Sequence, residues 1–130
     1  MARQNVPSGS PFESAIGFSR AVRVGHHLAV SGTAPIGPDG TTVGIGDAYR
    51  QAKRCIEIIA QALEEAGAGL TDVIRTRIFL ANAEDWEEVA RAHAEAFGDV
   101  RPASTFVEAS RFLNPEWLVE IEADALLPAE

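Results

Sequence analysis

The sequence is poor in cysteine and has no long apolar run. One cysteine among 130 residues cannot form an internal disulfide, a pattern typical of reducing compartments, and we therefore expect a cytoplasmic protein. No apolar run approaches the roughly 18 residues of a membrane span, and the start of the chain lacks the hydrophobic core of a signal peptide. A role in a membrane is therefore not expected.

Basic residues are also scarce relative to acidic ones. Eleven Lys and Arg stand against 19 Asp and Glu, which gives a formal net charge of -8. The long-range field of such a chain repels phosphate backbones. We therefore expect no nucleic-acid partner.

Several motifs that carry chemistry are missing: GxGxxG, the P-loop, HExxH, CxxC and Gly-x-Ser-x-Gly. His26 and His27 are adjacent, so on a strand they point to opposite faces and cannot easily share a metal ion. Cys55 lies within an apolar stripe, where a thiol behaves as a small hydrophobic group. His93 is placed on a helical stripe and is interpreted as a packing residue. No metal and no cofactor are expected.

What the sequence does have is a strongly alternating stretch at residues 117–126, which predicts a strand. One face of that strand is apolar: Trp117, Val119, Ile121, Ala123 and Ala125. The other face carries Glu120, Glu122 and Asp124. Three like charges spaced two apart repel one another, so this face is expected to meet either solvent or a polar functional space.

Two helices are predicted from apolar stripes at helical spacing. The first spans 48–66, with Asp47 as its cap and Gly67 ending it in a left-handed conformation. The second follows Asp85, which is expected to form a capping box with Glu88. Its expected buried stripe is Trp86, Val89, Ala92, His93, Ala96 and Phe97.

The remaining segments predict a mixed sheet within one domain, 1–130, that begins with a flexible tail over residues 1–14. Further strands are expected at 20–24, 28–31, 41–43, 73–80 and from residue 101 onward. The fold class is therefore α+β, in the order β-β-β-α-β-α-β-β, with both helices on one face. An oligomer would cover the other face. Arg75 and Arg77 share a face of their strand, where they either neutralise the carboxylates, the favoured reading, or bind a ligand carboxylate.

Seven short segments occur in an order and at spacings that identify a family. They are Ile16-Gly17-Phe18-Ser19, Val30-Ser31-Gly32, Gln51-Ala52, Asp72-Val73-Ile74, Arg101-Pro102-Ala103, Phe106-Val107-Glu108 and Val119-Glu120-Ile121-Glu122-Ala123. Over residues 15–126 the chain resembles the Rid family, also called YjgF or RidA and once labelled translation inhibitor or endoribonuclease. The resemblance implies a chorismate-mutase-like fold, a homotrimer, and small-molecule sites in the clefts between subunits.

The resemblance also implies an activity, the hydrolysis of reactive enamines and imines to a 2-keto acid and ammonia. Glu120 matches the glutamate that orients the attacking water, and Ser31-Gly32 match the Ser-Gly whose backbone lines the pocket. The arginine that holds the substrate carboxylate is replaced by Ser104. A tyrosine of the pocket corresponds to Phe18, and a cysteine to Phe106. Arg101 could take the place of the missing arginine only if the chain bends at Pro102.

Two functions remain open at this point. The protein is either a hydrolase for an imine, enamine or related small molecule with altered specificity, or a trimer that binds a metabolite or acts as a scaffold without catalysis. A serine cannot replace the charge of a guanidinium, and that loss is expected to weaken the binding of a small amino-acid-derived imine. A ribonuclease is disfavoured by the acidic balance and by the absence of a His/Lys arrangement.

Overall fold

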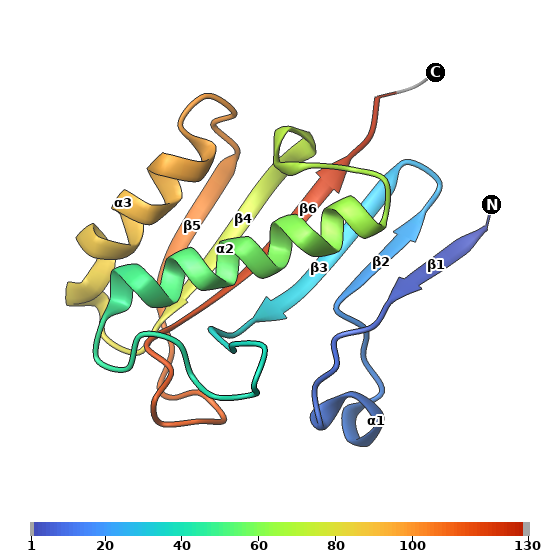
Figure 1. Ribbon diagram of the computed structural model, residues 1–130. Coiled ribbons are helices and arrows are strands. Elements are labelled where there is room, and N and C mark those ends of the chain that lie inside the picture. Colours follow the sequence, from blue (N-terminus) through green and yellow to red (C-terminus); the bar gives the residue numbers. More distant parts are fainter. Residues whose placement is uncertain (1, 129–130) are drawn as a thin grey trace.

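The computed structural model describes residues 2–128, which form one mixed sheet with two long helices on one of its faces (Figure 1). The elements in chain order are β1 (Arg3–Val6), α1 (Phe12–Ile16), β2 (Ala21–Val24), β3 (His27–Thr33), α2 (Ala48–Glu65), β4 (Val73–Leu80), α3 (Trp86–Phe97), β5 (Ala103–Glu108) and β6 (Val119–Leu126). Two short 3₁₀ turns, at Leu70–Asp72 and Ala83–Asp85, precede β4 and α3.

The sheet has six strands in the order β1-β2-β3-β6-β4-β5. All neighbours are antiparallel except β4 and β5, which run parallel. The chain makes that parallel connection through α3, as parallel strands require. β6, the last strand of the chain, lies in the middle of the sheet between β3 and β4. Its apolar side chains therefore enter the core, and its carboxylates lie in the middle of the opposite face.

The α2 helix forms where the apolar stripe predicted it. Asp47 accepts a hydrogen bond from the backbone of Arg50 at 3.0 Å, and Gly67 follows the helix with φ +87°. All seven positions of the expected stripe are buried: Ala48, Ala52, Cys55, Ile56, Ile59, Leu63 and Ala66. They pack on the apolar face of β6, where Val119, Ile121, Ala123 and Ala125 are also buried. The core therefore lies between α2, α3 and one face of the sheet.

The α3 helix differs from its prediction at its start. Asp85 makes no side-chain capping bond, so the capping box with Glu88 is wrong; instead, Asn82 accepts a hydrogen bond from the backbone of Glu84 at 2.9 Å. This bond caps the 3₁₀ turn that precedes the helix. Trp86 is 53% exposed, because it occupies the first helical position at the edge of the helix interface. The rest of the stripe is buried or half-buried.

β4 has the predicted bounds, but its two faces change places at one end. Strict alternation predicts Ile74, Thr76, Ile78 and Leu80 on one face and Val73 on the other. Thr76, Ile78 and Leu80 are indeed buried, but Val73 is buried with them and Ile74 is 49% exposed. A register shift between β4 and β6 lies between residues 73 and 75. Such an irregularity rotates the residues beyond it onto the opposite face, which the alternation alone does not reveal.

The expected tail and the expected strand at 41–43 are both corrected by the structure. Arg3–Val6 form β1 and pair with β2, and Phe12–Ile16 form the short helix α1. Only Val6 of β1 is buried, so an edge strand of this kind has no apolar alternation by which to recognise it. Residues 41–43 form no strand; a single bridge joins Ile36 and Thr42. Three strands still precede the first long helix, as predicted, but the additional one is β1 at the N-terminus and not residues 41–43.

Among residues 2–128, no helix is long and apolar enough to cross a membrane.

Candidate functional site

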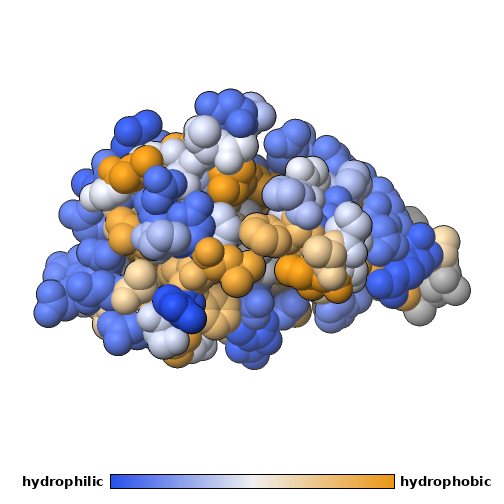
Figure 2. Space-filling view, turned by 90° about the horizontal axis from the view of Figure 1, so that it is seen from below, coloured by the Kyte–Doolittle hydropathy of each residue, from blue (hydrophilic) through white to orange (hydrophobic). Residues whose placement is uncertain are grey.

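A cavity lies at the end of the sheet where β3 ends and β6 begins. It has a volume of about 840 Å³. Its walls come from four places: the segment from β1 to α1, the loop after β3, the outer side of α2, and the chain leading into β6. Figure 2 views the molecule from this end and shows apolar side chains gathered in the middle of the face, among polar ones. Phe12, Ile16 and Leu113, which line the cavity, are 42%, 61% and 71% exposed.

An irregularity in β3 shapes one wall of this cavity. The pairing of β3 with β6 shifts register between Val30 and Thr33, which leaves Ser31 and Gly32 in a bulge. The Ser31 hydroxyl donates to the backbone oxygen of Ser19 at 2.9 Å and thereby ties the bulge to the chain before β2. A Cβ added to Gly32 would lie 3.1 Å from Oε1 of Glu120. Glycine therefore lets the backbone of the bulge approach the Glu120 carboxyl closely.

The Arg20 guanidinium holds the bulge from the other side. Its Nη1 donates to the Gly32 carbonyl at 2.9 Å, to the Thr33 hydroxyl at 3.0 Å and to the Ser31 hydroxyl at 3.2 Å. A longer bond of 3.4 Å reaches the Ser31 carbonyl. The guanidinium also lies 5.5 Å from the centre of the Phe18 ring. Burial lowers the pKa of Arg20, while the nearby Glu120 carboxylate opposes that shift.

Glu120 is the acidic group of the cavity. It is half-buried near the start of β6, on the face of the sheet that carries no helix. Burial raises the pKa of Glu120; the positive charge of Arg20 offsets part of that rise, and the neighbouring carboxylate of Glu122 adds to it. A carboxyl whose pKa moves toward neutrality can both accept and return a proton at physiological pH.

The structure brings together four of the predicted site residues and separates the other three. Phe18, Ser31, Gly32 and Glu120 line the same cavity. The predicted residues that do not line it are Arg101, Ser104 and Phe106.

The separation follows from strand pairing. Ser104 and Phe106 lie on β5, in register with Thr76 and Ile78 of β4, and so on the helix-covered face. Glu120 pairs with Phe79, whose side chain belongs to the opposite face. Within one chain, the position of the missing arginine and Glu120 are therefore on opposite faces of the sheet.

Ser104 and Arg101 have other partners in the chain. The Ser104 hydroxyl accepts from Thr76 Oγ1 at 2.9 Å, and the same Thr76 oxygen lies 2.9 Å from Nε2 of His93. Burial lowers the pKa of His93. The chain does bend before Pro102, since Arg101 has φ +55°. The bend directs its guanidinium to the Gly98 carbonyl, to which Nε donates at 3.2 Å.

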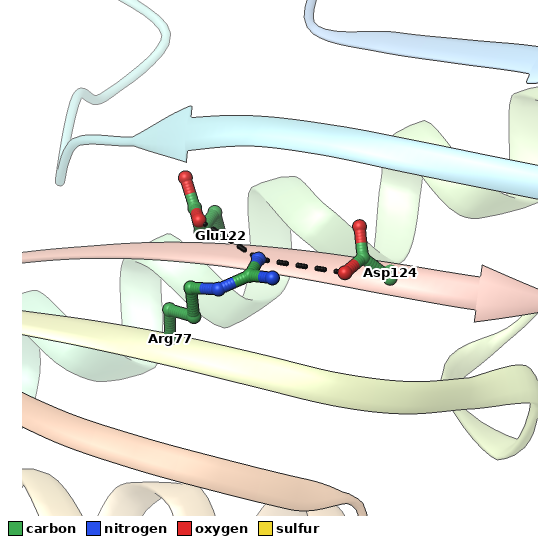
Figure 3. A network of polar contacts seen from close by, with 3 residues as sticks. All are labelled: Arg77, Glu122 and Asp124. Carbon is green, nitrogen blue, oxygen red and sulfur yellow. Dashed lines mark hydrogen bonds and ion pairs between the residues drawn. The ribbon is translucent and has the colours of Figure 1, made fainter.

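The remaining carboxylates of β6 are held by an arginine, as the favoured reading of the sequence predicted. Arg77 Nη1 lies 3.0 Å from Glu122 Oε1 and 3.4 Å from Asp124 Oδ2, so that one guanidinium bridges two carboxylates on the neighbouring strand (Figure 3). Arg75, on the same face of β4, is exposed. Arg77, Glu122 and Asp124 line a second, smaller cavity of about 410 Å³ on the face without helices. Glu120 alone among the three carboxylates of β6 lines the larger cavity.

The expected packing role of Cys55 agrees with the structure. Cys55 is fully buried and burial raises the pKa of its thiol. His26 and His27 are exposed at the β2–β3 turn. Within residues 2–128, no group of three or more His, Cys, Asp or Glu side chains lies together as a metal site would require.

Three residues that shape the site were not singled out for this role in the sequence. Arg20 occurs at the start of a predicted strand, and its role depends on a bulge that the sequence does not announce. Gln51 is fully buried and joins α2 to the chain before β6 through two hydrogen bonds of 2.7 and 2.9 Å, while a third, of 3.2 Å, reaches the Gly44 carbonyl in the loop before α2. Trp117 lines the cavity and is 9% exposed, and its indole nitrogen has no hydrogen-bond partner among the described residues. The resemblance includes Gln51 but assigns it no role.

Comparisons with known proteins identify the family of this chain. The model of a family described as Endoribonuclease L-PSP matches residues 9–127. An uncharacterised protein of Streptomyces coelicolor is 40% identical over 124 residues, covering 95% of this chain and 92% of that protein. The 3-aminoacrylate deaminase RutC of Acinetobacter baylyi is 32% identical over 120 residues, covering 92% and 94%.

A solved structure extends the agreement to the whole fold. The crystal structure of a YjgF-family member from Mycobacterium tuberculosis superimposes with a TM-score of 0.88 at 44% identity, covering 97% of this chain and 100% of that one. The mixed sheet with helices on one face is accordingly the chorismate-mutase-like α+β fold. The chain belongs to the Endoribonuclease L-PSP family, which is the YjgF/RidA family that the sequence resembles.

Proposed function

We propose that this protein hydrolyses a small imine or enamine, releasing ammonia, with Glu120 as the group that moves protons. One observation carries the proposal: a half-buried carboxyl with a raised pKa lines a cavity of about 840 Å³ beside the backbone of Gly32. A volume of this size accommodates a small metabolite together with water. The relative from Acinetobacter baylyi supports the choice of reaction, because its name describes the removal of ammonia from an enamine.

The chemistry needs one group that both accepts and donates a proton. Water adds to the carbon of the C=N bond, and Glu120 takes a proton from that water. The nitrogen of the former C=N bond takes a proton as the water adds, which gives a neutral carbinolamine. Glu120 then returns its proton to that nitrogen, the C–N bond breaks to release ammonia, and the hydroxyl loses its proton as the C=O bond of the product forms. An enamine first takes a proton on carbon, which gives the iminium ion (the protonated imine), and protonated Glu120 supplies that proton. General acid–base catalysis of this kind contributes about 10²–10⁴-fold in rate.

The assembly that we propose is a homotrimer in which a second copy completes each site. β5 lies at the edge of the sheet, with one side free of backbone pairing in the described chain. Five of its six residues are exposed, and Val107 among them is 44% exposed. Arg101, Ser104 and Phe106 lie on or next to this edge, away from Glu120 of their own chain. In a cleft between copies, they would face the cavity of a neighbour.

A direct assay tests the proposed activity. 2-Iminobutyrate is generated in situ, and its conversion to 2-oxobutyrate and ammonia is followed with and without protein. We expect faster decay with the wild type and a loss of about 10²-fold or more in Glu120→Gln. Glu122→Gln is the matched control, since it removes a carboxylate from the same face of β6 that pairs with Arg77 and does not line the larger cavity. Decay no faster than in buffer, or equal losses in both variants, would refute the role of Glu120.

The second candidate is a trimer that binds a metabolite in the same cavity without turning it over. The replacement of the family's carboxylate-binding arginine by Ser104 favours it, because a hydroxyl carries no charge. The two candidates differ in one result: a binder without activity gives saturable ligand binding and no acceleration of imine decay.

A further inference from the structure

We infer that Arg20 is the residue of this cavity that binds the carboxylate of the ligand. This inference rests on the proposed function for the placement of the reacting carbon beside Glu120. Its first support is the way in which Arg20 is bonded. All four of its hydrogen bonds leave from the single nitrogen Nη1. Nε and Nη2 have no hydrogen-bond partner in the described chain, and neither is enclosed away from solvent.

The free nitrogens form one edge of the guanidinium fork. Two parallel N–H donors on such an edge match the two oxygens of a carboxylate, and bidentate pairs of this kind are among the strongest hydrogen-bonded contacts in proteins. The bonds from Nη1 to the β3 bulge hold the fork in place before any ligand arrives. Preorganisation of this kind lowers the entropy cost of binding. Arg20 therefore combines a fixed position with an unused binding edge.

The second support is the relation between Arg20 and Glu120. The two side chains line the same cavity, where burial lowers the pKa of Arg20 against the charge of Glu120, and burial raises the pKa of Glu120 against the charge of Arg20. They form no ion pair within 4.0 Å in the described part of the chain, where the ion pairs are those of Arg54 and Arg77. Opposite charges that share a cavity without touching leave room for a ligand between them. A 2-imino acid fits such an arrangement, because its carboxylate is bonded directly to the C=N carbon that Glu120 would serve.

The other arginine of the cavity is less suited to this role. Arg54 also lines the cavity, but its Nη1 lies 3.4 Å from Glu57 Oε1, and its Nε donates to the Ile36 carbonyl at 2.7 Å. An acidic partner already offsets its charge, and the Nε side of its fork is occupied. Arg20 has neither restriction. It also supplies a guanidinium to a cavity that the position of the family's arginine, Ser104, does not line within one chain.

The test measures binding and does not depend on turnover. 2-Oxobutyrate and its uncharged amide, 2-oxobutanamide, are titrated into wild-type protein and into Arg20→Gln, and dissociation constants are obtained by NMR. We expect the acid to bind wild type more tightly than the amide does, and Arg20→Gln to weaken the acid about tenfold or more while changing the amide less than about twofold. Arg23→Gln is the control: Arg23 lies on β2, which begins directly after Arg20, also donates to backbone carbonyls, of Gly25 and Ala66, and does not line the cavity.

Each outcome bears on the inference. Equal weakening of acid and amide in Arg20→Gln would mean that Arg20 only braces the bulge, and the inference would fail. It would also fail if the acid did not bind wild type, or if Arg54→Gln abolished acid binding while Arg20→Gln did not. If Arg20→Gln does not fold, Arg20→Lys decides the matter: it keeps the charge but lacks the fork and should reduce the preference for acid over amide. Acid binding that depends on Arg20, without imine decay, would support the inference and refute the hydrolase.

Discussion

Replacing Gln51 by Met should destabilise the protein far more than its place on a helix suggests. Gln51 is fully buried on α2, yet its amide spans to two other segments. Its Nε2 donates to the Glu116 carbonyl at 2.9 Å and to the Gly44 carbonyl at 3.2 Å, and its Oε1 accepts from the Leu118 backbone at 2.7 Å. Methionine fills a similar volume but makes none of these bonds, so the change isolates their contribution.

The magnitude follows from the groups that lose their partner. A buried polar group left without a hydrogen bond costs about 1–3 kcal/mol. The half-buried Leu118 N–H bears this cost most fully, whereas exposed Glu116 lets water replace its lost donor. We therefore expect a loss of about 2–4 kcal/mol in the free energy of unfolding for Gln51→Met. That is a large fraction of the roughly 5–15 kcal/mol typical of a domain.

Urea unfolding followed by tryptophan fluorescence measures this loss. Protein concentration is held fixed, because the proposed trimer would make the apparent stability depend on it. Gln61→Met is the matched control on the exposed side of α2 and should change the free energy of unfolding by less than about 0.5 kcal/mol. In Gln51→Met the amide of Leu118 should also exchange faster with solvent. A Gln51 variant as stable as the Gln61 variant would refute the reasoning and show that water or repacking replaces all three bonds.

Two further substitutions act on Glu120 itself. Gly32→Ala places a methyl group 3.1 Å from Glu120 Oε1. It should displace the carboxyl by a few tenths of an ångström and lower the rate of imine hydrolysis, while changing the free energy of unfolding by less than about 1 kcal/mol. Gly69→Ala is the control: a Cβ there meets nothing within 4 Å, so both the rate and the stability should stay unchanged. Because the folded-state pKa of Glu120 is raised by burial against the opposing charge of Arg20, the stability that its protonated form provides is fully present below the unfolded-state pKa of about 4.3 and is lost as pH rises through the folded-state pKa. Glu120→Gln is neutral at every pH. In urea unfolding it should therefore be more stable than wild type at neutral pH and equally stable near the unfolded-state pKa of about 4.3. A stability advantage of Glu120→Gln that grows as the pH falls would contradict this assignment.

The parts of the fold that the sequence predicts well are those where one local pattern decides the outcome. The helix at 48–65 has a continuous apolar stripe and a capping aspartate, and β6 has strict alternation, so both appear where expected. β1 could not be predicted, because its residues are exposed and its pairing partner begins 15 residues after it ends. Ile74 could not be placed on its observed face, because a register shift depends on the neighbouring strand.

The same distinction between local pattern and sheet pairing applies to the candidate site. Glu120 and Gly32 are found by resemblance and by alternation, and they do lie together. The role of Arg20 needs the bulge at residues 31–32 to exist first, and no residue type in that stretch predicts a bulge. That Ser104 lies on the opposite face from Glu120 follows from the parallel pairing of β4 with β5, which is a property of the whole sheet. Local patterns therefore identify the chemistry, and topology decides which groups can meet.

The N-terminal strand β1 holds two parts of the candidate site in place. β1 is joined to β2 along Arg3–Val6, and the Val6 carbonyl accepts a hydrogen bond from the backbone of Arg20 at 2.8 Å. Residues 7–12, which follow β1, line one side of the cavity. Removing the first six residues would therefore release one wall of the cavity and remove a backbone hydrogen bond that positions Arg20. Glu120 and the central strands of the sheet would keep their own contacts.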